Sequence, residues 1–135
     1  MRTEQIPGLN IQWPWSRLIL EGKKTVETRS YPFPDKYRNV RLAIIETPGP
    51  KGKRFGIAEA KIVGIVTFSR CFQYESFEDW AMDYDRHGVP VDDPQYKFSP
   101  DQEKWGWEIT NVEVLQIERP APLKRGIVFA NDCQI

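Results

Sequence analysis

A short segment near the N-terminus brings together residue types that bind anions or transfer protons. Lys24, Thr25, Glu27 and Arg29 follow Gly22 within eight positions. Glycine tolerates a positive φ and so permits a sharp turn, after which the alternation of a strand would place Thr25, Glu27 and Arg29 on one side. We expect Lys24 to lie at the bend as a flexible charge that reaches towards them, so that two cations and one carboxylate converge.

These residues are compatible with catalysis, with ligand binding and with a structural role. As a catalytic site, a desolvated Lys24 would act as base or nucleophile, with Glu27 positioning it and Thr25 supplying a hydroxyl. As a binding site, Lys24 and the planar guanidinium of Arg29 would hold a phosphate or a carboxylate. The structural alternative is a Glu27–Arg29 ion pair that fixes a helix to the sheet, and the sequence leaves these alternatives open.

Aromatic residues flank this segment and would offer stacking surfaces for a nucleobase, at Trp13, Trp15 and Tyr31. Trp15 also belongs to the apolar face of a predicted helix, so a position in the core is the competing interpretation for that residue. We therefore predict one concave pocket that contains the two cations and the carboxylate, with at least one of the three rings at its rim.

Other kinds of site have little support. His87 is the only histidine, and at the end of a predicted acidic helix we expect it to be exposed to solvent and favoured by the helix dipole. We therefore predict no metal centre, no serine triad and no cofactor, although a magnesium site at Asp92 and Asp93 is an alternative to a solvated loop. Cys71 and Cys133 form no C-x-x-C pair, which predicts reduced thiols and a cytoplasmic protein.

Length and charge narrow the class of protein. A chain of 135 residues fits one domain, spanning residues 1–135, because this length buries a core without disulfides or metals. No apolar run reaches the roughly 18 residues that a membrane helix needs, so we expect no membrane contact. Residues 1–70 contain 13 Lys and Arg against 6 Asp and Glu, and residues 71–135 contain 6 against 13. If the two halves form different faces, the first attracts phosphates; two ordinary solvated surfaces are the alternative.

Hydropathy patterns predict the elements that would position these residues. Apolar alternation or continuous apolar runs predict strands at residues 9–13, 25–29, 41–46, 56–68, 105–115 and 123–129. Apolar residues at helical spacing predict helices over residues 14–21 and 76–87. Gly and Pro predict a basic hairpin loop over residues 48–53, and residues 88–104 predict a long acidic loop. The pattern favours an α+β fold in which five or six strands make a small mixed barrel, closed or nearly closed, with two or three short helices.

The segment around these functional candidates resembles the signature of ASCH domains, which belong to the PUA-like superfamily. Its G-x-K-x-x-E-x-R core is present in full, at Gly22, Lys24, Glu27 and Arg29. The similarity continues in the Tyr37-Arg38-Asn39 turn and in Trp105-Gly106-Trp107 before a long strand, and so covers most of the chain.

The resemblance implies a PUA-like β-barrel with a cleft that takes RNA, a nucleotide or a nucleoside, with Arg38 among the binding residues. Members of the family are assigned roles that include nucleic-acid binding, ribonuclease activity and removal of the acetyl group from N4-acetylcytidine. In the acetylcytidine hydrolases a Thr stands at the position of Glu27. We therefore expect binding of RNA or a modified nucleotide through the signature cleft, with hydrolysis of RNA or of modified nucleosides as the alternative. No protein partner and no role for the acidic segment 75–103 follow from the sequence.

Overall fold

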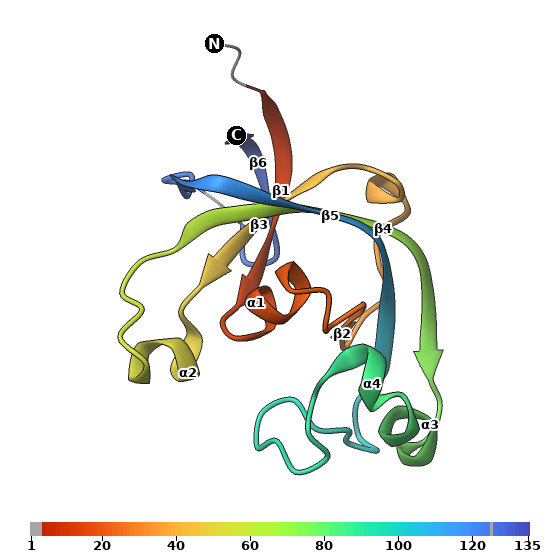
Figure 1. The fold of residues 1–135 in the computed structure, drawn as a ribbon. Helices are drawn as coiled ribbons and strands as arrows, with labels where there is room; N and C mark the ends of the chain where they lie inside the picture. The colour runs from red at the N-terminus through yellow and green to blue at the C-terminus, as the bar shows by residue number, and fades with distance from the viewer. Residues whose placement is uncertain (1–3, 125) are drawn as a thin grey trace.

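A six-stranded mixed sheet is the framework of the protein (Figure 1). The computed structural model describes residues 4–124 and 126–135. Its strands are β1 (Gln5–Gln12), β2 (Val26–Arg29), β3 (Leu42–Thr47), β4 (Lys61–Tyr74), β5 (Lys104–Pro120) and β6 (Phe129–Gln134). Their order in the sheet is β2-β5-β4-β3-β1-β6, with β1 and β3 parallel and all other neighbours antiparallel. The predicted α+β fold with five or six strands is confirmed.

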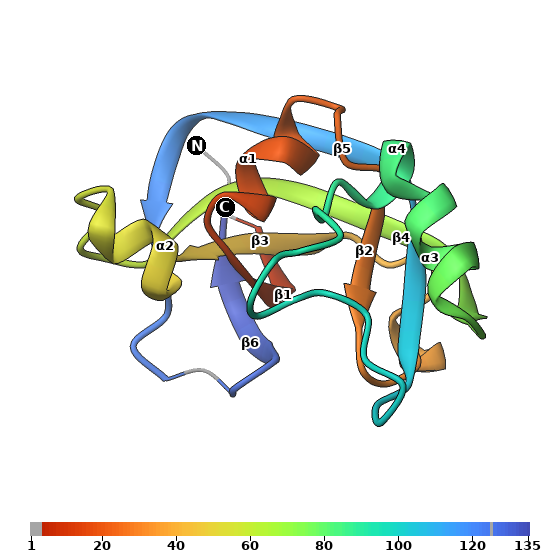
Figure 2. The same cartoon turned by 90° about the horizontal axis from the view of Figure 1, so that it is seen from below.

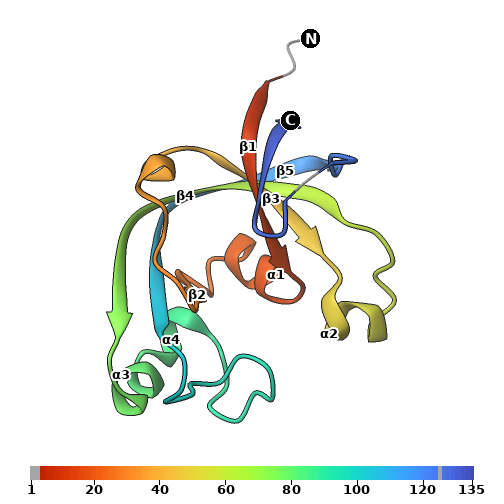
Figure 3. The same cartoon turned by 180° about the vertical axis from the view of Figure 1, so that it is seen from behind.

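Short helical segments connect the strands. They are α1 (Trp15–Leu20), the 3₁₀ turn η1 (Asp35–Tyr37), α2 (Gly49–Arg54), α3 (Phe77–Met82) and α4 (Tyr84–His87). Figures 1 and 3 show the sheet curving over α1, with α3 and α4 below the end of β4. No helix in the described ranges 4–124 and 126–135 is both long and apolar enough to cross a membrane.

The sheet curves but does not close. Its edges are β2 and β6, and within the described residues no ladder joins them, so a fully closed barrel is not formed. One physical reason is that β2 is only four residues long and pairs along β5 alone. The Arg29 side chain instead links β2 to β1, the neighbour of β6, because its Nη2 donates to the backbone oxygen of Asn10 at 2.8 Å.

The main core lies between the concave face of the sheet and α1. Leu9 and Ile11 of β1 and Ile19 of α1 are fully buried there, as the alternation of β1 and the helical spacing of α1 predict. Trp107 and Phe68 continue this core along β5 and β4, with their rings in edge-to-face contact at 5.7 Å. The opposite face buries a smaller cluster of Ala43, Ile45, Ile62, Ala130 and Cys133.

Several predicted boundaries are wrong. The supposed hairpin loop at 48–53 forms α2, with Pro48 before its first residue and Gly56 at φ +94° just after its end. The strand predicted over 56–68 therefore begins only at Lys61, and it runs on to Tyr74 because β5 pairs with it along that length.

The last strand and the middle helix also differ from prediction. The strand expected at 123–129 forms later, as β6. The helix expected over 76–87 is divided at Asp83, whose carboxylate accepts hydrogen bonds from Tyr74 and Arg86. These bonds hold Asp83 at a break between α3 and α4.

Candidate functional site

A cavity of about 670 Å³ opens between β1, β2, α1 and residues 88–103, a segment that we call the strap. Figure 2 shows the strap crossing beneath α1 and β2. Lys24, Glu27 and Arg29 all line this cavity, together with the rings of Trp15 and Tyr31. As predicted, the three charged residues share one pocket, and aromatic rings line it with them.

Lys24 lies at the floor of the pocket and is only 1% exposed. Gly22, at φ +76°, turns the chain out of α1, and the amides of Lys23 and Lys24 both donate to the backbone oxygen of Leu18. The Lys24 ammonium donates to the backbone oxygen of His87 at 2.5 Å and lies 3.5 Å from Oε1 of Glu27. The expectation of a flexible charge at the bend is wrong, because this turn fixes the backbone and points the side chain inward.

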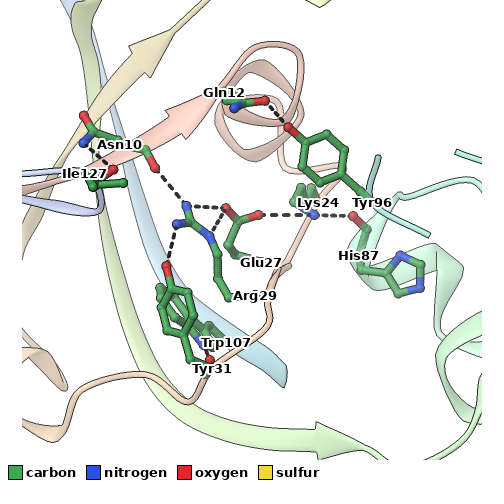
Figure 4. Close-up of polar contacts among 10 residues, drawn as sticks. All are labelled: Asn10, Gln12, Lys24, Glu27, Arg29, Tyr31, His87, Tyr96, Trp107 and Ile127. Carbon is green, nitrogen blue, oxygen red and sulfur yellow. Dashed lines mark hydrogen bonds and ion pairs between the residues drawn. The ribbon is translucent and has the colours of Figure 1, made fainter. Parts of the chain in front are cut away.

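Glu27 lies between two cations. Its Oε2 accepts hydrogen bonds from Nε and Nη2 of Arg29, at 3.2 and 2.9 Å. Arg29 also donates to the hydroxyl of Tyr31 at 3.2 Å, and its guanidinium stands 5.3 Å from the centre of the Trp107 ring. Figure 4 shows the ammonium, carboxylate and guanidinium in a row from α4 to β1.

Burial and charge together set the protonation of this row. Burial lowers the pKa of Lys24, and the Glu27 carboxylate only partly offsets that effect. Burial opposes ionisation of Glu27 as well, but Arg29 and Lys24 outweigh it, so the pKa of Glu27 is lowered. The carboxylate therefore stays ionised, whereas Lys24 is the member of the row that gives up a proton most easily.

Three predicted site residues lie outside the pocket. Thr25 is exposed, and its backbone is paired. Its amide donates to the backbone oxygen of Arg86, and its backbone oxygen accepts from the amide of Ile109. Arg38 is exposed and forms an ion pair with Asp35. Trp13 stacks on Phe55 at 4.7 Å, beside the pocket but not in its lining.

His87 is fully buried, so the prediction of an exposed histidine is wrong. Its ring stacks on Trp80 at 4.9 Å, Nε2 bonds to the backbone oxygen of Trp80 at 2.7 Å, and Nδ1 accepts from the amide of Val89 at 2.9 Å. An Nδ1 that accepts leaves the proton on Nε2, so the ring is neutral. Burial also lowers the pKa of His87. The ring thus anchors the start of the strap, and the backbone oxygen of His87 positions Lys24.

The acidic loop is held by specific contacts. Asp93 is buried, forms an ion pair with Lys51 at 2.8 Å, and accepts hydrogen bonds from the amides of Gln95 and Tyr96. The alternative of a magnesium site there has no support, since residues 4–124 and 126–135 contain no cluster of three His, Cys, Asp or Glu arranged to hold a metal.

The pocket residues that sequence reasoning missed include Gln12, Tyr96 and Lys104. The Tyr96 hydroxyl donates to Oε1 of Gln12, and the Lys104 ammonium donates to the backbone oxygen of Tyr96 at 2.8 Å. The sequence contained a signal for Gln12. It follows the core residue Ile11 in β1, so strand alternation points its side chain to the opposite face. The strap has no periodicity, so nothing local marked Tyr96.

Comparison with known proteins places the chain in a family. The model of the ASCH domain matches residues 9–121. The chain belongs to the ASCH domain family. The match contains the whole Lys24–Glu27–Arg29 row and most of the sheet. No curated protein matches the chain.

Solved structures of an ASCH protein from Zymomonas mobilis have the same fold. One aligns with a TM-score of 0.68 at 13% identity, over 93% of this chain and 85% of the other. Two single-substitution variants of that protein align with TM-scores of 0.62, at 14% and 18% identity. They cover 93% and 87% of this chain and 86% and 75% of theirs. At such identities the structural similarity supports the fold alone. The ASCH family as a whole is associated with RNA binding and hydrolase-like activity.

Proposed function

We propose that this ASCH domain binds RNA or a modified nucleotide, with one base in the pocket above Lys24, Glu27 and Arg29. The observation that carries the proposal is the combination of a charged row with aromatic walls in one open cavity of about 670 Å³. A pocket with apolar rings and a few fixed polar groups is the usual form of a small-ligand site.

The charges of the pocket favour an anionic ligand. Its lining contains three cationic side chains, of Lys24, Arg29 and Lys104, and one carboxylate, that of Glu27. A positive excess in a partly desolvated cavity attracts phosphate more strongly than the same charges do in water. The rings of Trp15, Tyr31 and Tyr96 supply faces and edges for a base.

Obstruction of the pocket tests this proposal without disturbing the charged row. Gln95 is exposed on the strap and lines the cavity, so Gln95→Trp should fill its mouth and lower affinity for short single-stranded RNAs and nucleotides at least about tenfold. Gln116→Trp is the matched control, because Gln116 is exposed on β5 away from the pocket. Fluorescence anisotropy measures both. Wild-type affinity in Gln95→Trp would reject the pocket as the binding site.

Hydrolysis is a second candidate function, favoured by the state of Lys24. A buried amine with a lowered pKa is a suitable general base or nucleophile near neutral pH, and Glu27 at 3.5 Å would orient it. Lys24→Met removes the amine and keeps a side chain of similar length, so turnover should fall at least about a hundredfold while the ligand still binds. Mass spectrometry of acylated nucleosides and RNA incubated with the wild-type protein is the assay, and an absence of product would exclude this candidate.

A further inference from the structure

The surface around α2 carries positive charge that the pocket does not use. Residues 49–57 contain three basic side chains and no acidic one. Lys51 is paired with Asp93, but Lys53 and Arg54 are exposed and have no acidic partner in the described part of the chain. Two neighbouring cations without counter-charges attract a polyanion, because no intramolecular ion pair must be broken first.

An aromatic ring is fixed beside these cations. Phe55 is 75% exposed, although large apolar side chains normally avoid such exposure. Its ring stacks on Trp13 at 4.7 Å and 28°, and its amide bonds to the backbone oxygens of Lys51 and Gly52. Trp13 thus covers one side of the ring and leaves most of it open to solvent. An ordered, exposed ring next to free cations is the combination that single-stranded nucleic acids bind, by stacking and phosphate contact.

This surface, which we call the α2 surface (Trp13, Lys53, Arg54 and Phe55), adjoins the pocket. Trp13 directly follows Gln12, a lining residue, and the lining residue Thr47 lies two positions before α2. Figures 1 and 2 show α2 on the same side of the sheet as the strap.

Lys51 connects α2 to the pocket wall. Its ammonium is 5.8 Å from the ring centres of both Trp15 and Tyr96, which line the cavity. A chain that leaves the pocket towards α2 would therefore meet the α2 surface next.

We propose that the α2 surface binds the RNA strand that continues from the pocket, with Lys53 and Arg54 on its phosphates and a base on Phe55. The inference rests on the proposed function, since it places one nucleotide in the pocket. It adds that the natural ligand is a polymer, single-stranded where it crosses α2, and not a free nucleotide. The combination of a stacking ring and unpaired cations favours RNA over an acidic protein segment, because RNA supplies bases that stack on the ring as well as phosphates that bind the cations.

The test compares a polymer with its monomers. A labelled pool of single-stranded RNA octamers of mixed sequence and the four nucleoside monophosphates are titrated at several salt concentrations. Lys53→Gln/Arg54→Gln should weaken octamer binding about tenfold or more at low salt. The slope of log K against log salt concentration should also become less steep by about 1.4, because each of the two lost phosphate contacts contributes about 0.7 on a single strand. Monophosphate binding should stay within about twofold of wild type.

Phe55→Leu separates stacking from charge. It keeps an apolar cover on Trp13 and should lower octamer affinity about tenfold without changing the salt dependence. Lys36→Gln/Arg70→Gln is the matched control, because both residues are exposed and neither lines the pocket. It should bind the octamers as the wild type does.

The outcomes distinguish the two proposals. If Gln95→Trp weakens octamer binding and the α2 variants do not, the pocket stands and the α2 inference is overturned. If the α2 variants weaken it and Gln95→Trp does not, RNA lies on the surface without entering the pocket, which overturns the proposed function and the continuous path. An equal loss in the Lys36→Gln/Arg70→Gln control shows unspecific charge attraction and also overturns the inference.

Discussion

Glu27→Gln is the sharpest test of the buried charged row. Glu27 is the only acidic residue in it, with Oε1 3.5 Å from the Lys24 ammonium and Oε2 2.9 Å from Nη2 of Arg29. At an effective dielectric constant of about 20, each pair contributes an attraction of about 5 kcal/mol before desolvation. Removal of one partner of a buried pair costs about 3–5 kcal/mol in measured cases, because an uncompensated charge stays behind.

Lys24 limits this cost by releasing its proton. At pH 7 deprotonation of an ordinary lysine costs about 4.6 kcal/mol, from a reference pKa of about 10.4, whereas Arg29 stays charged at any accessible pH. We therefore expect Glu27→Gln to lose about 3–5 kcal/mol of unfolding free energy at pH 7. Chemical denaturation followed by tryptophan fluorescence measures it.

The pH dependence of the variant gives an independent check. Burial already lowers the pKa of Lys24, and loss of the carboxylate that offsets burial should lower it further in the folded variant. The unfolded chain binds this proton up to about pH 10. Above the lowered pKa of the folded variant the unfolded state therefore binds more protons, so stability rises with pH until about pH 10, by up to about 1.4 kcal/mol per pH unit. Glu21→Gln is the control, since Glu21 is exposed and pairs only loosely with Lys23, at 3.5 Å. A Glu27→Gln protein within about 1 kcal/mol of wild type at pH 7 would refute the reasoning.

Three further predictions concern the parts that hold the pocket. His87 is neutral in the folded protein and binds a proton below about pH 6.5 in the unfolded chain, so the stability of the wild type should decrease as pH falls below that value. His87→Gln should make stability depend less steeply on pH in this range. Equal slopes for the two proteins in acid denaturation would contradict this. Lys51→Met removes the cation from buried Asp93 and should speed hydrogen exchange in the strap, whereas Lys53→Met on the same helix should not. Gly64→Ala should lower the free energy of unfolding by about 3 kcal/mol, since the new Cβ would lie 2.5 Å from Leu20 Cδ2 and 2.7 Å from the backbone oxygen of Glu113. Gly22→Ala should lower it by only about 1 kcal/mol, since space is open there and only the positive φ opposes the substitution. Calorimetry that gives the reverse order would show that packing at β4 is loose.

The sequence predicted the pocket well because its key residues are close together along the chain. One turn at Gly22 and one short strand place Lys24, Glu27 and Arg29, so local spacing determines their arrangement. Lys24 differed from prediction in burial, since its partner is the backbone oxygen of His87, 63 positions away, and no local pattern reports such a contact.

Boundaries failed where tertiary contacts outweighed local preference. Residues 49–54 are rich in Gly and Pro, which predicts a loop, yet they form α2, where Gly52 packs against Trp13. Of the two alternatives for the charge asymmetry, separate charged faces are not favoured, because basic residues of the first half pair with acidic residues of the second, as in Arg17–Glu118 and Arg41–Glu113. The halves are interleaved in space, so the linear pattern does not separate two faces.

The pairing of the first strand with the last affects how the chain can be cut and joined. Glu4 and Ile135 exchange backbone hydrogen bonds at 3.3 and 3.0 Å, and Figure 1 shows the start of β1 and the end of β6 on the side of the sheet away from the strap. A short linker could therefore join Ile135 to Glu4, with a new opening at the exposed residues 58–59. The permuted chain would turn the β1–β6 ladder from the most distant contact in the sequence into a hairpin. Folding rate rises as contact order falls, so this rearrangement should fold faster than the natural order while presenting the same pocket.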